Sequence, residues 1–180
     1  MRRAMDEVVL LSEDGTPIGT APKAQVHGAD TPLHLAFSCY LYDTSRRLLV
    51  SRRSLSKRTW PGVWTNSFCG HPAPGEQLED AVRRHGRLEL GVEVEGLHAE
   101  LPDFRYLAVD ASGVVENEVC PVFSAVTSSL VVPHPDEVME AVWVEPARLS
   151  AAVHLAPWAF SPWLALQIDQ LHNFTRENPV

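Results

Sequence analysis

Two glutamates separated by one residue are the first feature of this sequence that could do chemistry. Glu116 and Glu118 flank Asn117 within the mainly apolar run Val114 to Cys120. Because alternate residues of a β-strand face the same side, the two carboxylates should be neighbours. Two buried carboxylates repel each other and need a cation or a shared proton. The pair therefore predicts a cation site; the alternative is a solvent-facing strand edge.

Three histidines could supply the remaining ligands. His27 and His34 lie on either side of a short loop, and His71 follows the Cys69-Gly70 pair. Imidazole together with carboxylate suits a divalent transition metal better than calcium. Taken singly, each histidine would be an ordinary hydrogen-bonded or surface residue, so the prediction depends on the fold bringing them together.

Cys69 differs in context from the other two cysteines. It lies in the tight segment Asn66 to Pro72, next to a glycine and a candidate ligand, and a nearby cation would make its thiolate more accessible. A lone buried cysteine is usually a small hydrophobe, which is the expectation for Cys39 and Cys120. Three cysteines without a C-x-x-C pair argue against a disulfide framework and favour a reducing cytoplasm.

Short strand-like runs, punctuated by scattered proline and glycine, are expected to position these residues. Strands are predicted at 8–11, 33–42, 46–53, 104–109, 114–125 and 139–144, and helices at 76–90, 146–153 and 162–174. The turn at Asp43-Thr44-Ser45 predicts a hairpin, and Trp60 to Trp64 a rigid aromatic loop. Gly86 inside a helix costs about 1 kcal/mol relative to alanine, so something else must hold it there. Strands and helices that do not strictly alternate predict an α+β fold.

Length and composition limit the classes of protein to which this chain can belong. The 180 residues predict one domain, 1–180, and 45% hydrophobic and 21% charged residues exclude a disordered chain or a coiled coil. No apolar run approaches the ~20 residues of a transmembrane helix, and the N-terminus does not resemble a signal peptide. A net charge of −8 disfavours binding to nucleic acid or an acidic membrane.

The basic residues are nevertheless clustered. Six of the 15 fall within thirteen positions: Arg46, Arg47, Arg52, Arg53, Lys57 and Arg58. An anion site within an acidic chain and a solvated positive stretch explain this cluster equally well.

The strongest pattern is a degraded Nudix box, G-x5-E-x7-R-E-U-x-E-E-x-G-U, where U is a bulky aliphatic residue. The matching residues are Gly70, Glu76, Arg84, Glu89, Gly91 and Val92. The box forms a loop and helix whose glutamates hold a divalent ion against a diphosphate. His85, Gly86 and Leu88 depart from it, and two of the three replace metal-binding glutamates. These losses argue against ordinary Nudix hydrolysis but leave a Nudix-type mixed β-sheet core flanked by helices as the expected fold.

Five separated segments resemble type I isopentenyl-diphosphate isomerases, the bacterial members most, in the family's order and over Val8 to Leu171. They are His34–Ser38, Trp60–Ser67, Cys69–Pro72, Glu116–Glu118 and Trp158–Trp163. The resemblance implies a cytoplasmic enzyme, a monomer or weak dimer, that interconverts isopentenyl and dimethylallyl diphosphate. Its partner would be this small prenyl diphosphate, with no nucleic acid and no membrane.

The resemblance also implies the roles of individual residues. It assigns a Mn²⁺ or Mg²⁺ ion, with Zn²⁺ as an alternative, to the ligands His27, His34, His71, Glu116 and Glu118. It implies that Glu89 binds a second Mg²⁺, which arrives with the substrate diphosphate, and that Lys23, Arg53 and Lys57 bind the diphosphate itself. Cys69 would be the catalytic thiol and Glu118 the catalytic carboxylate. Tyr106 and Trp163 would lie beside the reacting hydrocarbon.

One position departs from the family. His85 stands where these enzymes usually have a second arginine after Arg84, so it is predicted to contact phosphate or, alternatively, to face solvent without a function. Three other functions stay open: a Nudix hydrolase of a diphosphate compound, a non-catalytic Nudix binding module, and an isomerase-like scaffold that cyclises a longer prenyl diphosphate.

Overall fold

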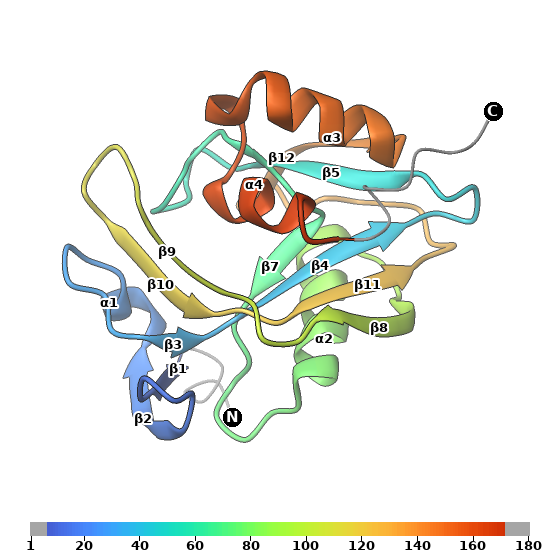
Figure 1. Cartoon of the computed structure of the whole chain (residues 1–180). Coiled ribbons are helices and arrows are strands. Elements are labelled where there is room, and N and C mark those ends of the chain that lie inside the picture. Colours follow the sequence, from blue (N-terminus) through green and yellow to red (C-terminus); the bar gives the residue numbers. More distant parts are fainter. Residues whose placement is uncertain (1–6, 172–180) are drawn as a thin grey trace.

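Two mixed β-sheets and the helices packed against them make up residues 7–171, which the computed structural model describes (Figure 1). The first sheet has the order β2-β1-β3-β10-β9 and consists of β1 (Glu7–Leu11), β2 (Pro17–Pro22), β3 (His34–Leu35), β9 (Arg105–Val109) and β10 (Val115–Val119). The second has the order β12-β5-β4-β11-β8, with β6 paired to β5 and β7 to β4. Its strands are β4 (Phe37–Tyr42), β5 (Leu48–Arg53), β6 (Trp64–Thr65), β7 (Phe68–Gly70), β8 (Glu95–Leu101), β11 (Val122–Val126) and β12 (Val138–Val144). The predicted α+β class is confirmed.

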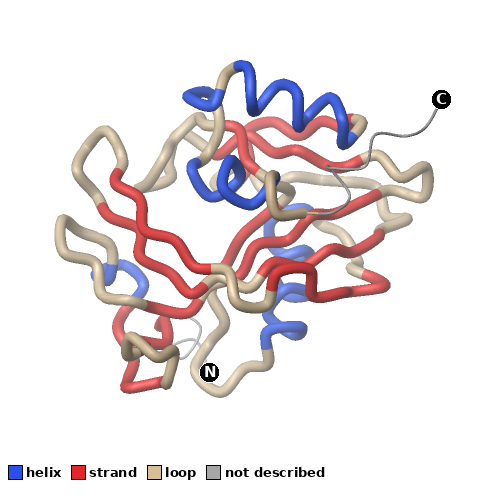
Figure 2. Tube along the Cα trace, viewed as in Figure 1, coloured by secondary structure: helices blue, strands red, loops and turns tan. Residues whose placement is uncertain are grey.

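Helices cover both faces of the second sheet (Figures 1 and 2). Helix α2 (Leu78–Leu90) lies on one face, and α3 (Pro146–Leu155) and α4 (Pro162–Ile168), joined through a 3-10 turn at Pro157–Ala159, lie on the other. The short α1 (Lys23–Val26) instead packs against β1 and β2 of the first sheet. Along β4, Phe37 and Leu41 pack in the cluster that includes α2, whereas Tyr40 packs with residues of α3 and α4. Because successive side chains of a strand face opposite ways, a strand that is apolar throughout fits this central position between two helical layers.

Two predicted strands are each divided between the sheets, so their prediction as single elements is wrong. The range 33–42 forms β3 and β4, which separate at Ala36, and the range 114–125 forms β10 and β11, which separate at Cys120 and Pro121. The two pairs run parallel, β3 beside β10 and β4 beside β11. Pro121 has no backbone N–H, so it cannot continue the ladder, and the chain bends there into the other sheet. This bend places the first sheet as a separate lobe (Figure 1).

The remaining element predictions hold with shifted ends. The hairpin around Asp43 is confirmed, since β4 and β5 pair antiparallel and the Asp43 carboxylate accepts the backbone N–H groups of Ser45 and Arg47. The helix predicted at 162–174 is regular over α4, and positions 172–174 lie outside the described residues. Strands β2 and β8 were not predicted: β2 begins and ends with proline and contains Gly19, and β8 is a largely exposed edge strand without clear alternation.

Helix α2 has one buried stripe that includes Glu89 of the Nudix box and the two departing residues His85 and Gly86. Its buried residues recur at helical spacing: Ala81, Val82, His85, Gly86, Glu89 and Leu90. The helix ends at Gly91, whose φ of 67° is in the left-handed region where glycine avoids a steric penalty. A Cβ on Gly86 would lie 2.6 Å from Val94 Cγ2 and 3.6 Å from the ring of Phe68. Close packing, not helix propensity, therefore explains Gly86.

This packing predicts that Gly86→Ala destabilises the protein. Overpacking costs about 1–3 kcal/mol and should exceed the ~1 kcal/mol gained in helix propensity. We expect the free energy of unfolding, measured in urea, to fall by about 1 kcal/mol. Leu88→Ala on the exposed side of the same helix should change it by less than about 0.5 kcal/mol. A Gly86→Ala variant more stable than the wild type would contradict this explanation.

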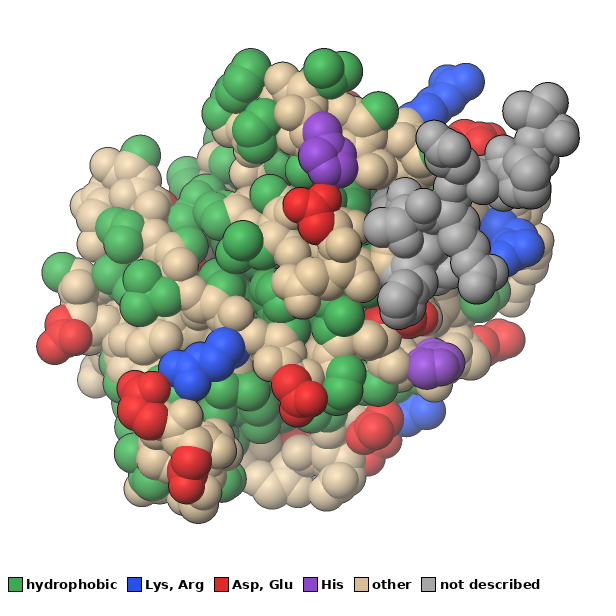
Figure 3. All heavy atoms as spheres, in the orientation of Figure 1, with side chains coloured by type: hydrophobic (Ala, Val, Ile, Leu, Met, Phe, Trp, Pro, Cys, Tyr) green, Lys and Arg blue, Asp and Glu red, His purple; other side chains and the backbone are tan. Residues whose placement is uncertain are grey.

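Charged side chains are scattered over the face drawn in Figure 3 and do not form one continuous patch. Half of the basic cluster is engaged with acidic neighbours. Arg47 pairs with Asp43, Arg52 with Glu140, and Lys57 with Glu137. Among the described residues, no helix has both the length and the apolar character needed to cross a bilayer.

Candidate active site

A cavity of about 580 Å³ opens where the two sheets meet. Residues from both sheets and from three helices line it, so the strand bends at Ala36 and Pro121 determine its position. The lining includes all but one of the predicted site residues: Lys23, His27, Arg53, Lys57, Cys69, His71, Glu89, Tyr106, Glu116, Glu118 and Trp163. The exception, His34, is fully buried beside Glu118.

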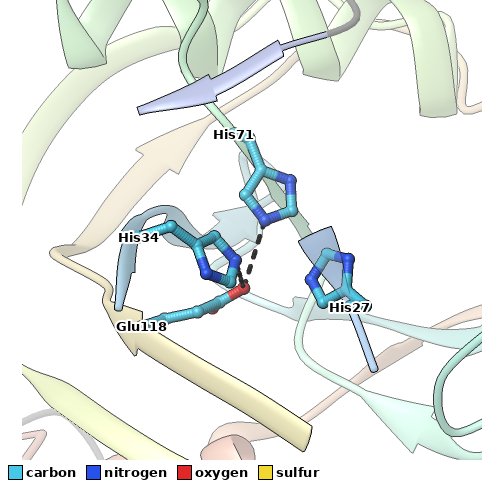
Figure 4. Close-up of side chains that lie close together, drawn as sticks. All are labelled: His27, His34, His71 and Glu118. Atoms are coloured by element: carbon cyan, nitrogen blue, oxygen red, sulfur yellow. Dashed lines mark hydrogen bonds and ion pairs between the residues drawn. The ribbon is translucent and has the colours of Figure 1, made fainter. Parts of the chain in front are cut away.

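Four side chains converge at one end of this cavity (Figure 4). His27 follows α1, His34 begins β3, His71 follows β7, and Glu118 lies on β10. One ligand atom from each of the four lies within 4.8 Å of the others. Glu116, on the same face of β10, reaches His27, because their closest atoms are 2.9 Å apart. The fold therefore brings together all five residues of the predicted cation site.

Several polar atoms of this group have no hydrogen-bond partner. Among the described residues, His27 Nε2, His34 Nε2, His71 Nδ1 and Glu116 Oε2 are buried and make no hydrogen bond of good geometry, although His27 Nε2 and Glu116 Oε2 lie 2.9 Å apart. His34 Nε2 lies 3.4 Å from Glu118 Oε1, and His71 Nε2 donates to the same oxygen at 3.2 Å. An unpaired buried polar atom costs about 1–3 kcal/mol, which a bound cation would relieve. The donor set is thus compatible with a divalent metal ion.

Burial and hydrogen bonding act in opposite directions on these groups. Burial alone would raise the pKa of the Glu118 carboxyl, but the neighbouring imidazoles of His34 and His71 hold that pKa well below its usual range. Burial lowers the pKa of His71 to about 3, so its imidazole is neutral. Ionised carboxylate and neutral imidazole are the forms in which these side chains bind metals.

Strand register places a phenol beside the carboxylate. Glu118 is paired across the sheet with His34 on one side and with Tyr106 on the other. The Tyr106 hydroxyl donates a hydrogen bond of 2.9 Å to Glu118 Oε2. Burial raises the pKa of Tyr106 well above its usual value, so the phenol stays protonated and can keep this bond.

Cys69 faces the cavity from the other sheet. Its thiol donates to Asn66 Oδ1 at 3.2 Å, and its sulfur lies 3.4 Å from the Ser38 hydroxyl oxygen. Burial raises the pKa of the Cys69 thiol to about 11, so the protonated form predominates near neutral pH. By contrast, Cys39 and Cys120 are buried and do not line the cavity.

Asn66 was not predicted to take part in this site. Its side-chain oxygen accepts hydrogen bonds from Cys69, from Thr65 Oγ1 at 2.9 Å and from Trp163 Nε1 at 3.0 Å. Its amide nitrogen donates to two backbone carbonyls, those of Cys39 and Phe68. Asn66 therefore fixes the thiol and the indole relative to each other. The available signal was a polar residue in a tight aromatic segment, but its partners are distant in sequence.

Trp163 lies at the apolar end of the cavity, 3% exposed. Its ring packs 5.7 Å from that of Tyr106, and Trp60 from the predicted aromatic loop meets it edge to face at 5.4 Å. The Arg53 guanidinium lies 5.3 Å from the Trp163 ring centroid and donates to the carbonyls of Thr59 and Trp60. These contacts fix the indole within a largely aromatic wall.

Glu89 and His85 form a buried pair on α2. His85 Nδ1 lies 2.6 Å from Glu89 Oε1, and each residue is 7% exposed. Burial would raise the pKa of the Glu89 carboxyl, but the hydrogen bond from His85 lowers it below its usual value. The expectation that His85 faces solvent is therefore wrong. The ring does not face solvent, and it does not line the cavity, because it points at Glu89.

Residues 32–164 match the family model described as the NUDIX domain. The structure of DR0079 from Deinococcus radiodurans is similar with a TM-score of 0.71 and 20% sequence identity, over 92% of this chain and 99% of that one. The structure of a MutT NUDIX hydrolase from Burkholderia pseudomallei is similar with a TM-score of 0.58 and 21% sequence identity, over 77% of this chain and 97% of that one. These likenesses show the fold, and with the domain match they define the class: this is a Nudix protein.

Curated relatives narrow this class further. A protein of Agromyces mediolanus is 63% identical over 164 residues, which are 91% of this chain and 80% of that protein. One of Leifsonia xyli subsp. xyli is 57% identical over 176 residues, 97% of this chain and 95% of that protein. Both carry the name isopentenyl-diphosphate Delta-isomerase. The chain belongs to this family, and the resemblance drawn from its sequence is confirmed.

Proposed function

We propose that this enzyme interconverts isopentenyl diphosphate and dimethylallyl diphosphate, with Cys69 and Glu118 as its acid–base pair. The observation that carries the proposal is that a thiol and a carboxylate from two different sheets line one cavity. The carboxylate is held by the histidine group and by Tyr106, and the thiol by Asn66. Both groups are therefore positioned before a substrate enters.

The reaction moves a double bond and conserves all atoms. One group adds a proton to the terminal carbon of the isopentenyl alkene, which leaves a tertiary cation. The other removes a proton from the carbon two bonds from the diphosphate oxygen, which forms the dimethylallyl alkene. A thiol and a carboxylate on opposite faces of a flat substrate can exchange these roles, so the same pair serves the reverse direction.

The aromatic wall supports the difficult step. Protonating an unactivated alkene creates a cation that would react with water. The face of Trp163 can stabilise a desolvated cation by about 2 kcal/mol. The burial of this ring and of Tyr106 keeps that part of the cavity apolar.

A divalent ion fits the group His27, His34, His71, Glu116 and Glu118. We propose Mn²⁺ or Mg²⁺ there, with Zn²⁺ as an alternative, since imidazole-rich sites favour transition metals. When bound, the ion supplies positive charge that keeps Glu118 and the Tyr106 phenol in defined protonation states. Glu118 would then serve both as a ligand and as the carboxylate that exchanges a proton.

Other residues that line the cavity are suited to the diphosphate. Glu89 would hold a second Mg²⁺ that arrives with the substrate, and Lys23, Arg53 and Lys57 would contact the phosphate oxygens. Oxygen ligands and substrate phosphates are the usual environment of Mg²⁺. In the substrate-free protein the Lys57 ammonium pairs with Glu137, so substrate must replace this partner or share the ammonium with it.

Lys57→Ala should therefore weaken substrate binding more than turnover. We expect KM for isopentenyl diphosphate to rise about tenfold, which corresponds to ~1.4 kcal/mol, because one charge-assisted phosphate contact is lost. Steady-state kinetics over a range of substrate concentrations would separate KM from kcat. Arg47→Ala is the matched control, since Arg47 belongs to the same basic run but does not line the cavity. Equal KM values for Lys57→Ala and the wild type would remove Lys57 from the diphosphate site.

Nothing larger than this small diphosphate is proposed as a partner. We propose that residues 1–180 act as one cytoplasmic domain, a monomer or weak dimer, that binds neither nucleic acid nor membrane. The net charge of −8 and the absence of a continuous charged patch on the face in Figure 3 argue against binding to nucleic acid or to an acidic membrane. Light scattering at several protein concentrations would test the oligomeric state.

Incubation with Mg²⁺ and either five-carbon diphosphate tests the proposed reaction. The expected result is formation of the other isomer without release of phosphate. Phosphate release would instead indicate a Nudix hydrolase, which is disfavoured because His85 and Leu88 stand where the box has metal-binding glutamates. Absence of any product would indicate a binding module, and cyclic products from longer prenyl diphosphates would indicate a cyclising scaffold.

A further inference from the structure

His85 occupies a position between the Nudix helix and the strand that carries Cys69. Its Nδ1 lies 2.6 Å from Glu89 Oε1, and its Nε2 lies 3.4 Å from the backbone oxygen of His71. The ring packs edge to face against Phe37, with centroids 5.3 Å apart. The imidazole therefore contacts both α2 and the segment that follows β7.

Gly70 accommodates this ring. A Cβ on Gly70 would lie 2.5 Å from the nearest ring atom of His85, a separation that real Cβ atoms essentially never show. The strand can approach the helix only because position 70 lacks a side chain. Gly70 also separates Cys69 from His71, so the imidazole packs directly beneath the backbone that carries two site residues. Its orientation is consequently fixed by its surroundings.

The direction of the short hydrogen bond is fixed as well. An ionised carboxylate only accepts hydrogen bonds, so Nδ1 of His85 is the donor to Glu89. This bond occupies one oxygen of a carboxylate that lines the cavity. It restricts rotation about the three side-chain bonds of Glu89, and it leaves the second oxygen for a ligand.

We propose that His85 is a positioning residue that holds the Glu89 carboxylate for the magnesium ion of the substrate diphosphate. The inference rests on the proposed function insofar as it takes Glu89 as that ligand. His85 itself contacts neither substrate nor ion. It replaces neither the carboxylate that the Nudix box has at this position nor the family's arginine contact; it supports Glu89, the one glutamate that remains in the R-E-U-x-E-E part of the box.

Three substitutions separate the two hydrogen bonds of the ring. His85→Leu removes both. His85→Asn retains a donor at the position of Nδ1, facing Glu89, and His85→Gln retains one nearer to Nε2, facing the His71 carbonyl. We expect His85→Leu to raise the magnesium concentration for half-maximal isomerisation about 10–100-fold, the usual effect of losing a partner of a ligand. His85→Asn should stay within a few-fold of the wild type, and His85→Gln should resemble His85→Leu.

Calorimetric titration with Mg²⁺ and inorganic pyrophosphate provides a readout that does not depend on turnover. Binding should weaken strongly in His85→Leu and His85→Gln and only slightly in His85→Asn. The urea midpoints of His85→Asn and His85→Gln should stay similar to each other. Should His85→Leu fail to fold, the comparison of His85→Asn with His85→Gln still tests whether the hydrogen bond to Glu89 matters. Wild-type magnesium dependence in His85→Leu, or rescue by Gln and not by Asn, would overturn the inference. A wild type that binds magnesium pyrophosphate but does not isomerise would refute the proposed function alone.

Discussion

Cys69→Ala and Glu118→Gln should each reduce turnover of isopentenyl diphosphate by at least about 1,000-fold while the protein stays folded. Each substitution removes one of the two groups that exchange protons with the substrate, and acid–base groups typically contribute 10²–10⁴-fold. Both changes nearly preserve side-chain volume, so circular dichroism and urea midpoints should remain close to those of the wild type. Initial rates measured with each purified variant would check the prediction.

Cys39→Ala and Cys120→Ala are the matched controls. Their thiols are buried and do not line the cavity, so turnover should stay within a few-fold of the wild type. Cys120 also contacts the Ser38 hydroxyl, at 3.4 Å, which makes it a stringent control for effects transmitted to Cys69. Near-normal turnover by Cys69→Ala or by Glu118→Gln would remove that residue from the proposed pair.

The second large effect concerns the metal. Protein washed with a chelator should retain about one divalent transition-metal ion per chain, and His71→Ala should lose both this ion and activity. The reason is the set of buried nitrogen and oxygen atoms that lack hydrogen-bond partners among the described residues, which a single cation would satisfy together. Elemental analysis of the wild type and the variant would measure the loss.

Glu89→Gln separates the two metals. Glu89 lies on α2 and does not belong to the histidine group, so this variant should keep the tightly bound ion but bind the magnesium ion of the substrate diphosphate more weakly. His71→Ala that keeps both metal and activity would show that the histidine group is not the metal centre.

Much of the site could be predicted from sequence because its signals are local. The alternation of Glu116 and Glu118 on one strand fixes their shared face, and the box spacing fixes Glu89 on a helix. Residues whose role depends on distant partners could not be found in this way. Asn66 is defined by contacts with Cys69 and Trp163, and His85 by its fit against Gly70.

The fold shows the same division between local and distant information. Central strands and the helix after Gly75 follow from apolar periodicity and turn residues. The bends at Ala36 and Pro121 were missed because an apolar strand that changes sheets has the same pattern as one that does not. Pro121 was the available signal, since a proline interrupts a ladder inside a sheet. These bends create the cavity. The sequence therefore predicted the site residues but not the arrangement of the two sheets that brings them together.

Conversion of isopentenyl diphosphate in D₂O is the most direct test of protonation followed by deprotonation. A thiol or carboxyl group exchanges its proton with the solvent, so in D₂O it delivers deuterium, which must appear in the product. At early conversion, nuclear magnetic resonance should find dimethylallyl diphosphate with one deuterium in a methyl group and no free phosphate. A product without deuterium would mean direct transfer of the substrate's own hydrogen, and released phosphate would mean hydrolysis; either result would contradict the proposed reaction.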